Sequence, residues 1–290
     1  MVAAIEAGGT KFRVAVGTGP GGIEAERTIP TTTPAETLDR VVGFVRSTGI
    51  AVASAGIASF GPIDLDPSSP SYGSILATPK PGWSGAAVLG VVTAGLGVPV
   101  AVDTDVGGAA LAEMRWGAAR GLSDIVYFTV GTGVGGGVIV GGRIHHGVGH
   151  PEVGHIPVTP EAGDAYPGHC PFHGGCLEGM ACGPAIGDRW GRPAADLGGR
   201  DEVWDLEARY LAQGIRAVTY LLAPQRVVLG GGVMQQRGLL CRVRRHLERQ
   251  LAGYGSAPLP GGADGYVAAA ALGPDAGLLG AIALGIEAAG

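Results

Sequence analysis

The feature that most constrains the fold of this chain is a succession of segments that occurs twice. Near the start, VAAIEA leads into the glycine turn 8–11, then into FRVAVG and a third expected strand around residues 22–29. From Asp124 the succession returns as DIVYFTV, the turn GTGVGG, and the segments GVIVGG and RIHHG. Two copies of strand, glycine turn, strand and strand predict a duplicated α/β unit with a cleft between the copies.

Composition indicates a globular protein with two lobes. The 290 residues are enough for two ordinary domains, and 46% hydrophobic residues with a net charge of −5 oppose disorder despite 55 glycines and 20 prolines. Basic residues cluster only at 242–245, which we interpret as a solvated helix face. The charge pattern therefore favours neither nucleic acid nor an anionic membrane as a partner.

The sequence gives no indication of a membrane or secretory protein. The first residues, MVAAIEAGGTKF, lack the basic leader and the long apolar run of a signal peptide. The apolar stretch 278–286 is too short for a bilayer, and its helical spacing predicts an amphipathic docking helix. Four cysteines in such a chain favour a reducing compartment, where a close Cys/His group more often binds metal. We expect a cytoplasmic protein.

Hydrophobic periodicity predicts further elements. Pro34, followed by apolar residues at helical spacing, predicts a helix from that point. Similar patterns predict helices over 85–94, 106–119 and 239–251. Between them, the Pro/Ser-rich segment 61–83 is long enough to indicate a loop with a function.

The glycine turns suggest phosphate binding. GTGVGG matches G-x-G-x-x-G at Gly131, Gly133 and Gly136, but a dinucleotide fingerprint requires a helix there, whereas GVIVGGRI is typical of a β-hairpin. The P-loop pattern does not occur. Two hairpin turns remain, at 8–11 and 131–133, and each offers backbone N–H groups and a threonine hydroxyl to phosphate oxygens. The alternative is that both are plain tight hairpins.

Several segments together resemble one protein family. They are IEAGGTKF, FGPIDLDPSSPSYGSILATPKPGW, DTDVGGAALAE, FTVGTGVGGG, and HPEVGH with CPFHGGCLEGMACGPAI, in this order along the chain. The set is similar to the ROK family and, within it, to the fructokinase/mannokinase branch; GGG at 230–232 adds to a likeness to actin-like sugar kinases. The resemblance implies an actin-like (ribonuclease H-like) duplicated sugar-kinase fold. Its N-terminal lobe would span 1–118, with helix 275–290 docking back on it, and its C-terminal lobe 119–274.

Asp105 is the candidate catalytic carboxylate. It follows the strand PVAVD and precedes a predicted helix, so the alternative is a helix N-cap. Phosphoryl transfer uses a carboxylate that orients the attacking hydroxyl and accepts its proton, and the resemblance implies that Asp105 is this base. Two neighbours stand where the family often has asparagine: Thr104, which matches the fructokinase branch, and Gly107, which lacks an expected polar contact.

ATP and Mg²⁺ have their own candidate residues. The phosphates would lie at the two turns, formed by Gly8, Gly9, Thr10 and Lys11 and by Gly131, Thr132 and Gly133. By resemblance, adenine would lie near Pro184, Gly231, Gly232 and Met234. Glu6 precedes the first turn by two residues and would hold a water of the Mg²⁺ ion that bridges the phosphates. The alternative for Glu6 is a charge at a strand end.

The segment GHCPFHGGCLEG, residues 168–179, concentrates two cysteines and two histidines. The preceding HPEVGH is not H-E-x-x-H, and its H-x-E is not followed by the P-C-x-x-C of zinc deaminases. A closed, structural, tetrahedral Zn²⁺ site is predicted instead, with His155, Cys170, His173 and Cys176 as ligands. His169 is a competing ligand, and buried free thiols are the alternative. Cys182 and Cys241 are predicted as core residues.

The zinc loop is expected to shape a sugar pocket. By resemblance Glu152, His155 and Glu178 contact the sugar, and zinc would fix the orientation of the His155 imidazole. Further substrate positions are Gly61, Pro62, Trp83 and Thr104. Trp83 would form an aromatic wall against the sugar; the alternative is that it only anchors its loop to its own lobe.

The sequence thus predicts an ATP-dependent, Mg²⁺-assisted fructokinase that converts D-fructose to fructose 6-phosphate and forms a homodimer. Fructose is expected to be the best substrate, mannose the second and glucose a poor one. The alternatives are a mannokinase or glucokinase of the same family and a sugar-binding protein without catalysis. A sugar-responsive repressor would need a helix-turn-helix before the first strand, and we do not find one in the sequence.

Overall fold

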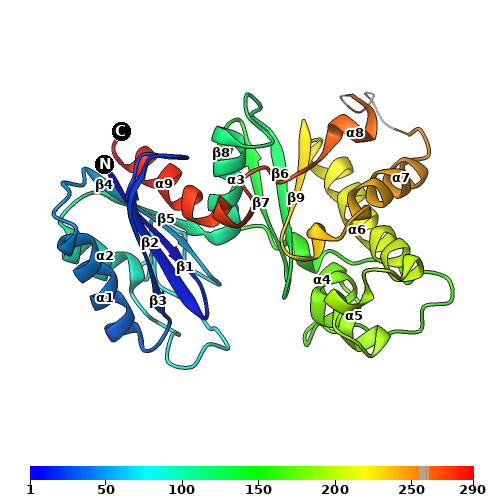
Figure 1. Ribbon diagram of the computed structural model, residues 1–290, viewed down its shortest axis with the longest axis horizontal. Coiled ribbons are helices and arrows are strands. Elements are labelled where there is room, and N and C mark those ends of the chain that lie inside the picture. The colour runs from blue at the N-terminus through cyan, green and yellow to red at the C-terminus, as the bar shows by residue number, and fades with distance from the viewer. Residues whose placement is uncertain (255–258, 260) are drawn as a thin grey trace. The chain divides into compact units, whose positions relative to one another are not determined.

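The computed structural model describes residues 1–254, 259 and 261–290, and their contacts form two compact units (Figure 1). Unit 1 consists of Met1–Trp116, Arg143–His150 and Pro274–Gly290, and unit 2 of Gly117–Gly142 and Pro151–Gly273. The predicted lobes stay a prediction, and the units differ from them chiefly in one segment. Residues 143–150, expected in the second lobe, pack with unit 1.

Unit 1 contains a five-stranded sheet and four helices. The strand order is β3-β2-β1-β4-β5, in which β1 is antiparallel to β2 and parallel to β4. The strands are β1 (Val2–Ala7), β2 (Lys11–Gly17), β3 (Ile23–Pro30), β4 (Ser54–Ser59) and β5 (Val100–Thr104). The helices are α1 (Pro34–Ser47), α2 (Val88–Leu96), α3 (Asp105–Trp116) and α9 (Ala276–Ala288).

Alternation along β1 sends side chains to both faces of this sheet. Ala3 and Ile5 join a hydrophobic core with residues of α1 and α2, whereas Glu6 faces Gly277 at the start of α9. In Figure 1, α1 and α2 lie on one side of the sheet and α9 on the other. The prediction that α9 is amphipathic is wrong, because α9 packs against β1, β4, β5 and α3 and is buried on most sides.

Glycines allow α9 to pack closely on its neighbours. A Cβ atom on Gly280 of α9 would collide with the backbone of Gly108 in α3, and one on Gly56 of β4 would collide with the carbonyl oxygen of Ala281. The absence of side chains at these positions lets helix and sheet backbones touch. The helix therefore docks on the sheet as predicted, but through backbone contact over most of its surface.

The second sheet, of which four strands lie in unit 2, repeats the topology of the first. It has the order β10-β9-β6-β7-β8, with β6 antiparallel to β7 and parallel to β9, so each strand has a counterpart in the first sheet. Its edge strand β8 belongs to the segment Arg143–His150, which is grouped with unit 1. The strands are β6 (Ile125–Val130), β7 (Val134–Val140), β8 (Arg143–Ile144), β9 (Arg226–Gly230) and β10 (Val267–Ala269). The helices are α4 (Leu177–Ala181), α5 (Gly183–Trp190), α6 (Asp201–Leu222), α7 (Leu239–Leu251) and α8 (Gly262–Tyr266). The predicted duplication is confirmed.

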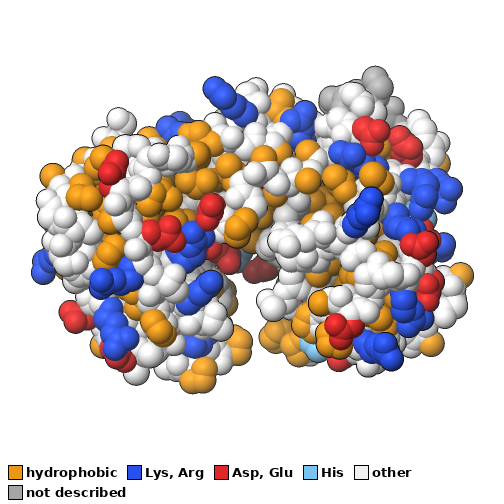
Figure 2. Space-filling view, in the orientation of Figure 1, with side chains coloured by type: hydrophobic (Ala, Val, Ile, Leu, Met, Phe, Trp, Pro, Cys, Tyr) orange, Lys and Arg blue, Asp and Glu red, His pale blue; other side chains and the backbone are white. Residues whose placement is uncertain are grey.

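Some features of unit 2 differ from the sequence predictions. The 22-residue α6 lies where no helix is predicted above. Arg242, Arg244 and Arg245, expected on a solvated face, form ion pairs with acidic residues of α6 and α8, and Figure 2 shows basic and acidic side chains intermixed over this part of the surface. Cys241, predicted in the core, is exposed, whereas Cys182 is buried as predicted. In the described part of the chain, no helix combines the length and the apolar character that a membrane crossing needs.

Candidate functional site

Unit 2 contains a compact group of four potential metal donors. His155 ends the 3-10 turn η1 (Val153–His155), and Cys170, His173 and Cys176 come from the loop that leads into α4. The donor atoms lie within 4.8 Å of one another. His155 Nδ1 is 3.5 Å from Cys176 Sγ and 3.8 Å from Cys170 Sγ. The structure therefore brings together the four residues that the sequence pattern predicts as ligands.

A tight turn and a helix cap hold the two cysteines of this group. The backbone N–H of Cys170 donates to Gly174 O at 3.3 Å, and the N–H of Gly174 donates back to Cys170 O at 2.9 Å. Cys176 is the N-cap of α4, where its Sγ accepts the N–H of Gly179 at 3.5 Å. The loop backbone thus fixes both sulfur atoms without help from a distant part of the chain.

The chemistry of the donor set fits Zn²⁺. Burial raises the pKa of the Cys176 thiol to about 11, so a thiolate here needs a neighbouring cation. Two sulfurs and two imidazole nitrogens are a donor set that could hold Zn²⁺ in a closed tetrahedron. His169 is not part of the group, because its Nδ1 lies 2.6 Å from Asp188 Oδ2.

The predicted sugar-binding residues of unit 2 lie beside this group. His155 directs Nδ1 toward the cysteine sulfurs, which leaves Nε2 on the other edge of the ring for a further partner. Glu152 immediately precedes η1, and its carbonyl oxygen accepts the N–H of His155 at 3.0 Å. Glu178 lies in the first turn of α4, two residues after Cys176. All three residues therefore lie within or beside the segments that carry the four donors.

Glu178 also contacts the second glycine turn. Its Oε2 accepts the backbone N–H of Val134 at 3.0 Å, across 44 residues of sequence. A Cβ atom on Gly133 would lie 2.6 Å from the same oxygen, so this approach of the carboxylate requires glycine. Spacing along the chain gives no signal for such a contact, because the two segments meet only in the folded unit.

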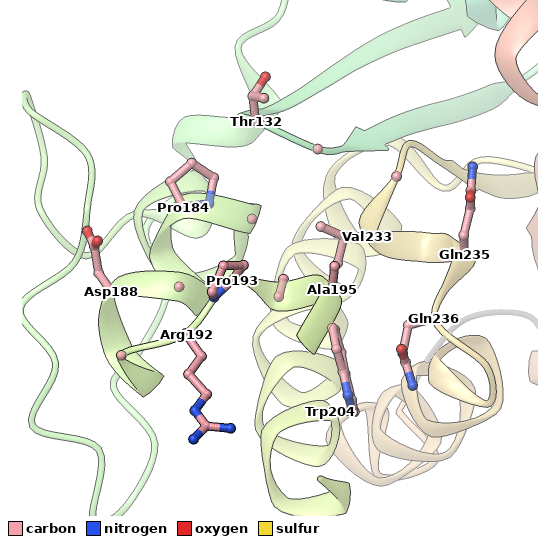
Figure 3. Close-up of a pocket in the computed structure, with 16 residues that line it drawn as sticks. Thr132, Pro184, Asp188, Arg192, Pro193, Ala195, Trp204, Val233, Gln235 and Gln236 are labelled. Atoms are coloured by element: carbon pink, nitrogen blue, oxygen red, sulfur yellow. The ribbon is translucent and has the colours of Figure 1, made fainter. Parts of the chain in front are cut away.

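A pocket of about 1210 Å³ in unit 2 includes this turn (Figure 3). Four of the predicted nucleotide residues line it: Gly131, Thr132, Pro184 and Gly232. Gly133, Gly231 and Met234 are not among its lining residues, and Met234 packs against the hydrophobic core of unit 2. Polar and aromatic lining residues that the sequence analysis does not single out are Asp188, Arg192, Trp204, Gln235 and Gln236.

The start of α5 lies against the turn that lines this pocket. Gly183 N donates to Gly131 O at 2.7 Å, and Gly131 N donates to Gly133 O at 2.8 Å. Cys182 caps the helix, with Sγ accepting the N–H of Ala185 at 3.4 Å. Because a helix N-terminus carries partial positive charge, this side of the pocket suits phosphate oxygens.

In unit 1, Asp105 is the first residue of α3 and is exposed. Its Oδ1 accepts the N–H of Val106 at 2.9 Å. The N-cap is Thr104, whose Oγ1 accepts the N–H of Gly107 at 2.9 Å, so the capping alternative for Asp105 is wrong. Thr104 itself is only 4% exposed, and its hydroxyl is used within unit 1.

Glu6 lies near the same helix terminus. Its Oε2 is 3.5 Å from Arg13 Nη1. Burial raises the pKa of Glu6, the charge of Arg13 opposes this, and the neighbouring charge of Asp105 raises the pKa further. Two carboxyl groups that repel each other favour a bound cation, which fits the predicted role of Glu6 near Mg²⁺.

The first glycine turn is a tight hairpin between β1 and β2. Gly8 N donates to Lys11 O at 3.0 Å, and Thr31 Oγ1 donates to the carbonyl oxygen of Gly8 at 2.7 Å. Thr10 and Lys11 are exposed, and Gly9 lies between them and the strand end. These bonds form a tight hairpin, which both interpretations of the turn include, and phosphate binding at this turn stays a prediction.

Trp83 is not an aromatic wall. Its side chain is 0% exposed, and its Nε1 donates to Thr32 O at 2.8 Å. Its ring centroid lies 5.5 Å from those of Phe12 and Phe60. This corrects the predicted sugar contact, because a side chain enclosed by its own unit cannot pack against a substrate. Gly61, in the same loop, is exposed, and the neighbouring Pro62 is half-buried; their predicted contacts stay predictions.

Comparison with known proteins gives consistent matches over the whole chain. A model of the ROK family matches residues 2–288. A putative fructokinase of Bacillus subtilis is 42% identical over 289 residues, covering 99% of this chain and 96% of the relative. A fructokinase of Zymomonas mobilis is 42% identical over 293 residues, covering 98% and 96%. A crystal structure of a ROK family glucokinase from Streptomyces griseus, in complex with glucose and AMPPNP, is 27% identical, with a TM-score of 0.77 over 99% of each chain.

Proposed function

The chain belongs to the ROK family and has the actin-like fold of its sugar kinases, and on this premise we propose that it is a fructokinase. It transfers the γ-phosphoryl group of ATP to D-fructose and releases fructose 6-phosphate and ADP. Fructose is favoured because the relatives at 42% identity are named fructokinases, whereas the glucokinase is 27% identical. Mannose is the expected second substrate.

The observation that carries this proposal is the position of the turn 131–133. On one side, Gly131 and Thr132 line the large pocket against the start of α5. On the other side, Gly133 and Val134 contact the carboxylate of Glu178. A nucleotide in the pocket and a sugar at Glu178 would share one turn, and phosphoryl transfer depends on such proximity of donor and acceptor.

Each candidate residue has a distinct role in this proposal. Glu152, Glu178 and the Nε2 atom of His155 bind hydroxyl groups of the sugar. The N–H groups of the two turns bind phosphate oxygens. Asp105 orients the attacking hydroxyl and accepts its proton as the new phosphate ester bond forms. Closure around the substrates would exclude water and so limit hydrolysis of ATP.

Two metal ions support these residues. His155, Cys170, His173 and Cys176 would hold Zn²⁺, which neutralises the thiolates and keeps the His155 ring in one orientation. Glu6 would hold a water of Mg²⁺, which offsets the negative charge of the phosphates. The sugar-binding and proton-accepting steps themselves belong to the side chains.

Steady-state release of ADP with fructose, mannose, glucose and N-acetylhexosamines tests the proposal, with ATP hydrolysis without sugar as the control. We expect kcat/KM to be highest for fructose, lower for mannose and lowest for glucose, because the acceptors fit related hexoses unequally. A value for glucose equal to or above that for fructose would replace the fructokinase assignment by a glucokinase. No sugar-dependent ADP release with any hexose would refute the kinase and leave a sugar-binding protein.

We also propose that the enzyme acts in the cytoplasm and as a homodimer. All four cysteines are free thiols, as expected in a reducing compartment. The homodimer is proposed from the resemblance to the family. Light scattering on the purified enzyme tests it: we expect the mass of two chains of 28.9 kDa, and the mass of one chain would contradict the proposal.

A further inference from the structure

Unit 1 contains an ion pair that the proposed reaction does not yet use. His146 Nε2 lies 2.9 Å from Asp103 Oδ2; the side chain of Asp103 is 4% exposed and that of His146 is 32% exposed. The histidine belongs to the segment Arg143–His150, which packs with unit 1. A carboxylate as buried as that of Asp103 requires partners to remain ionised, and His146 supplies a charged one when it is protonated.

Asp103 connects this histidine to the start of α3. Its Oδ1 accepts the N–H of Thr104 at 2.7 Å and the hydroxyl of Thr104 at 3.2 Å. The oxygen of that hydroxyl accepts the N–H of Gly107 at 2.9 Å and so caps the helix. Asp105 lies between Thr104 and Gly107 in the chain. The orientation of its backbone therefore depends on the contacts that Asp103 makes.

Gly107 also depends on the position of the Asp103 side chain. A Cβ atom at this position would collide with Asp103 Oδ1 and would lie 2.9 Å from Thr104 Oγ1. Glycine stands here, where asparagine is frequent in the family, because the carboxylate of Asp103 occupies the space of a side chain. His146 and Gly107 thus both fit a single placement of Asp103.

From this geometry we propose that His146 is a positioning residue for phosphoryl transfer. Its pair with Asp103 holds the N-terminus of α3 so that Asp105 meets the sugar hydroxyl in the orientation that accepts its proton. This inference rests on the proposed kinase function and on Asp105 as the base. In this role His146 acts through Asp103 on Asp105, so it acts on kcat and leaves the binding of ATP and fructose unchanged.

Charge makes the pair sensitive to pH. The hydrogen bond with Asp103 raises the pKa of His146, and burial opposes this. Asp103 also interacts electrostatically with Tyr72 and Glu287. Glu287 in turn interacts with Arg115 and Arg143. Since the pKa of His146 is raised, His146 is charged below that value, and as the pH rises through it His146 loses its positive charge but keeps an N–H donor. The part of kcat that depends on this charge therefore declines on the alkaline side.

The first experiment compares His146→Ala with His145→Ala, which removes the adjacent exposed histidine as a matched control. We expect His146→Ala to lower kcat roughly ten- to a hundredfold, because small displacements of a reacting group have effects of this size. KM for ATP and for fructose should stay within about twofold, whereas the thermal midpoint should fall, because the buried carboxylate of Asp103 loses its charged partner. His146→Gln keeps an N–H donor without a charge, so it should restore part of kcat and remove the alkaline decline.

The second experiment is a double-mutant cycle with Asp103→Asn. Since both changes break one pair, their effects on kcat should not multiply in the double variant. Wild-type kcat in His146→Ala, or independent losses that multiply, would overturn the inference. So would a lower thermal midpoint with unchanged kcat and an unchanged pH profile at temperatures where the variant is folded, which would indicate a purely structural role. If the wild-type enzyme releases no ADP, the kinase function fails as well, whereas an active wild type with an equally active His146→Ala defeats the positioning role alone.

Discussion

Asp103 and Asp105, which are separated only by Thr104, have opposite environments at the start of α3. Asp103 is 3% exposed and is bonded to Thr104 and His146, whereas Asp105 is exposed at the first position of the helix. A buried, fully bonded carboxylate organises the backbone, and an exposed one can meet a substrate. Asp103 is thus placed to support the backbone, and Asp105 is placed to meet a substrate, as we propose.

Asp105→Asn should abolish most of the activity and leave the fold intact. The amide keeps the shape of the side chain but cannot accept the proton of the hydroxyl, so kcat should fall by about 10²–10⁴. Steady-state kinetics with fructose measure the loss, and Asp39→Asn on the exposed face of α1 is the matched control. Near-normal kcat in a folded, metal-loaded Asp105→Asn enzyme would contradict its role as the base.

Trp83→Ala should affect stability and not sugar binding. The ring is enclosed by Phe12 and Phe60, and its Nε1 is bonded to Thr32 O. Truncation of such a buried aromatic residue lowers the free energy of unfolding by about 3–5 kcal/mol, with KM for fructose unchanged. Denaturant unfolding measures this, and Trp83→Phe should lose less because a ring remains. A raised KM for fructose at normal stability would restore the wall interpretation.

Sequence patterns predict the positions of residues well where the spacing along the chain is short. The four candidate zinc donors are brought together and the two glycine turns form hairpins, as predicted, while their roles stay predictions. Trp83 is different, because its exposure depends on Phe12 and Phe60, which come from separate parts of the chain. The contact of Glu178 with Val134 could not be predicted for the same reason.

At the scale of elements, the loop that carries three of the four metal donors borders two proposed sites of unit 2. It ends in the N-cap of α4, which carries Glu178, and it includes His169, which contacts Asp188 among the residues that line the pocket. The loop therefore borders both proposed substrate sites. Under the proposal, loss of the metal should disturb sugar binding first, because His155 would be shared between the metal and the sugar.

Cys176→Ser should lower metal content and stability together. The wild type should contain about one Zn²⁺ per chain by elemental analysis, because the four donors form one closed tetrahedron. Replacement of a thiolate weakens zinc binding and removes the stability that is linked to it, so the thermal midpoint should fall. Cys241→Ser, at an exposed cysteine outside the group, is the control. An active enzyme without metal would contradict the prediction.

Asp205 on α6 should make stability depend on acid pH. Burial alone would raise its pKa, but hydrogen bonds from His246 and Arg209 outweigh this and lower the pKa to about 2. The stabilisation is complete above the ordinary pKa of an aspartate and is lost as the pH falls through about 2. Asp205→Asn should remove on the order of 1 kcal/mol at neutral pH and flatten the acid limb, measured by denaturant unfolding from pH 2 to 6. Asp201→Asn, at the exposed start of the same helix, should change little; equal effects of the two variants would contradict the prediction.

Sequence patterns give an incomplete account of two helices, α6 and α9. The helix α6 has Val203, Trp204, Ala208, Leu211 and Ile215 at helical spacing and all buried, so a signal for it exists among its many charged residues. For α9 the sequence predicts the helix but not its burial on several sides. Polar residues are scarce in α9, and the helix is enclosed by the sheet and by α3. Burial on several sides comes from tertiary contacts, which periodicity alone does not contain.

At the scale of the whole molecule, unit 1 is assembled from three separate parts of the chain. The last of them contains α9, which covers β1 and β4 and touches the backbone of α3 at Gly108. The helix that begins with Asp105 therefore packs against a helix 170 residues later in the sequence. Neither unit corresponds to one continuous half of the chain. The predicted lobes already place helix 275–290 with the first lobe, and the units differ from them chiefly at residues 143–150.

A chain that ends after Gly273 should fail to form a stable unit 1. Removal of α9 exposes one face of the sheet and the buried side of α3, and hydrophobic surface of this extent is not tolerated in water. We expect an aggregated product without kinase activity, measured by its soluble fraction and by ADP release. A chain that ends after Ala288 keeps all of α9 and is the control. Full activity of the shorter chain would contradict the role assigned to this helix.

The same arrangement sets an order of events during protein synthesis. The strands β1 to β5 leave the ribosome early, but one face of their sheet stays uncovered until residues 276–288 emerge. Folding of the N-terminal part before the rest, which is usual for multidomain chains, is therefore not open to unit 1. Unit 2 is complete in sequence before unit 1 can close. A copy whose translation stops early consequently lacks the helix that packs against α3, the element that carries the proposed base Asp105.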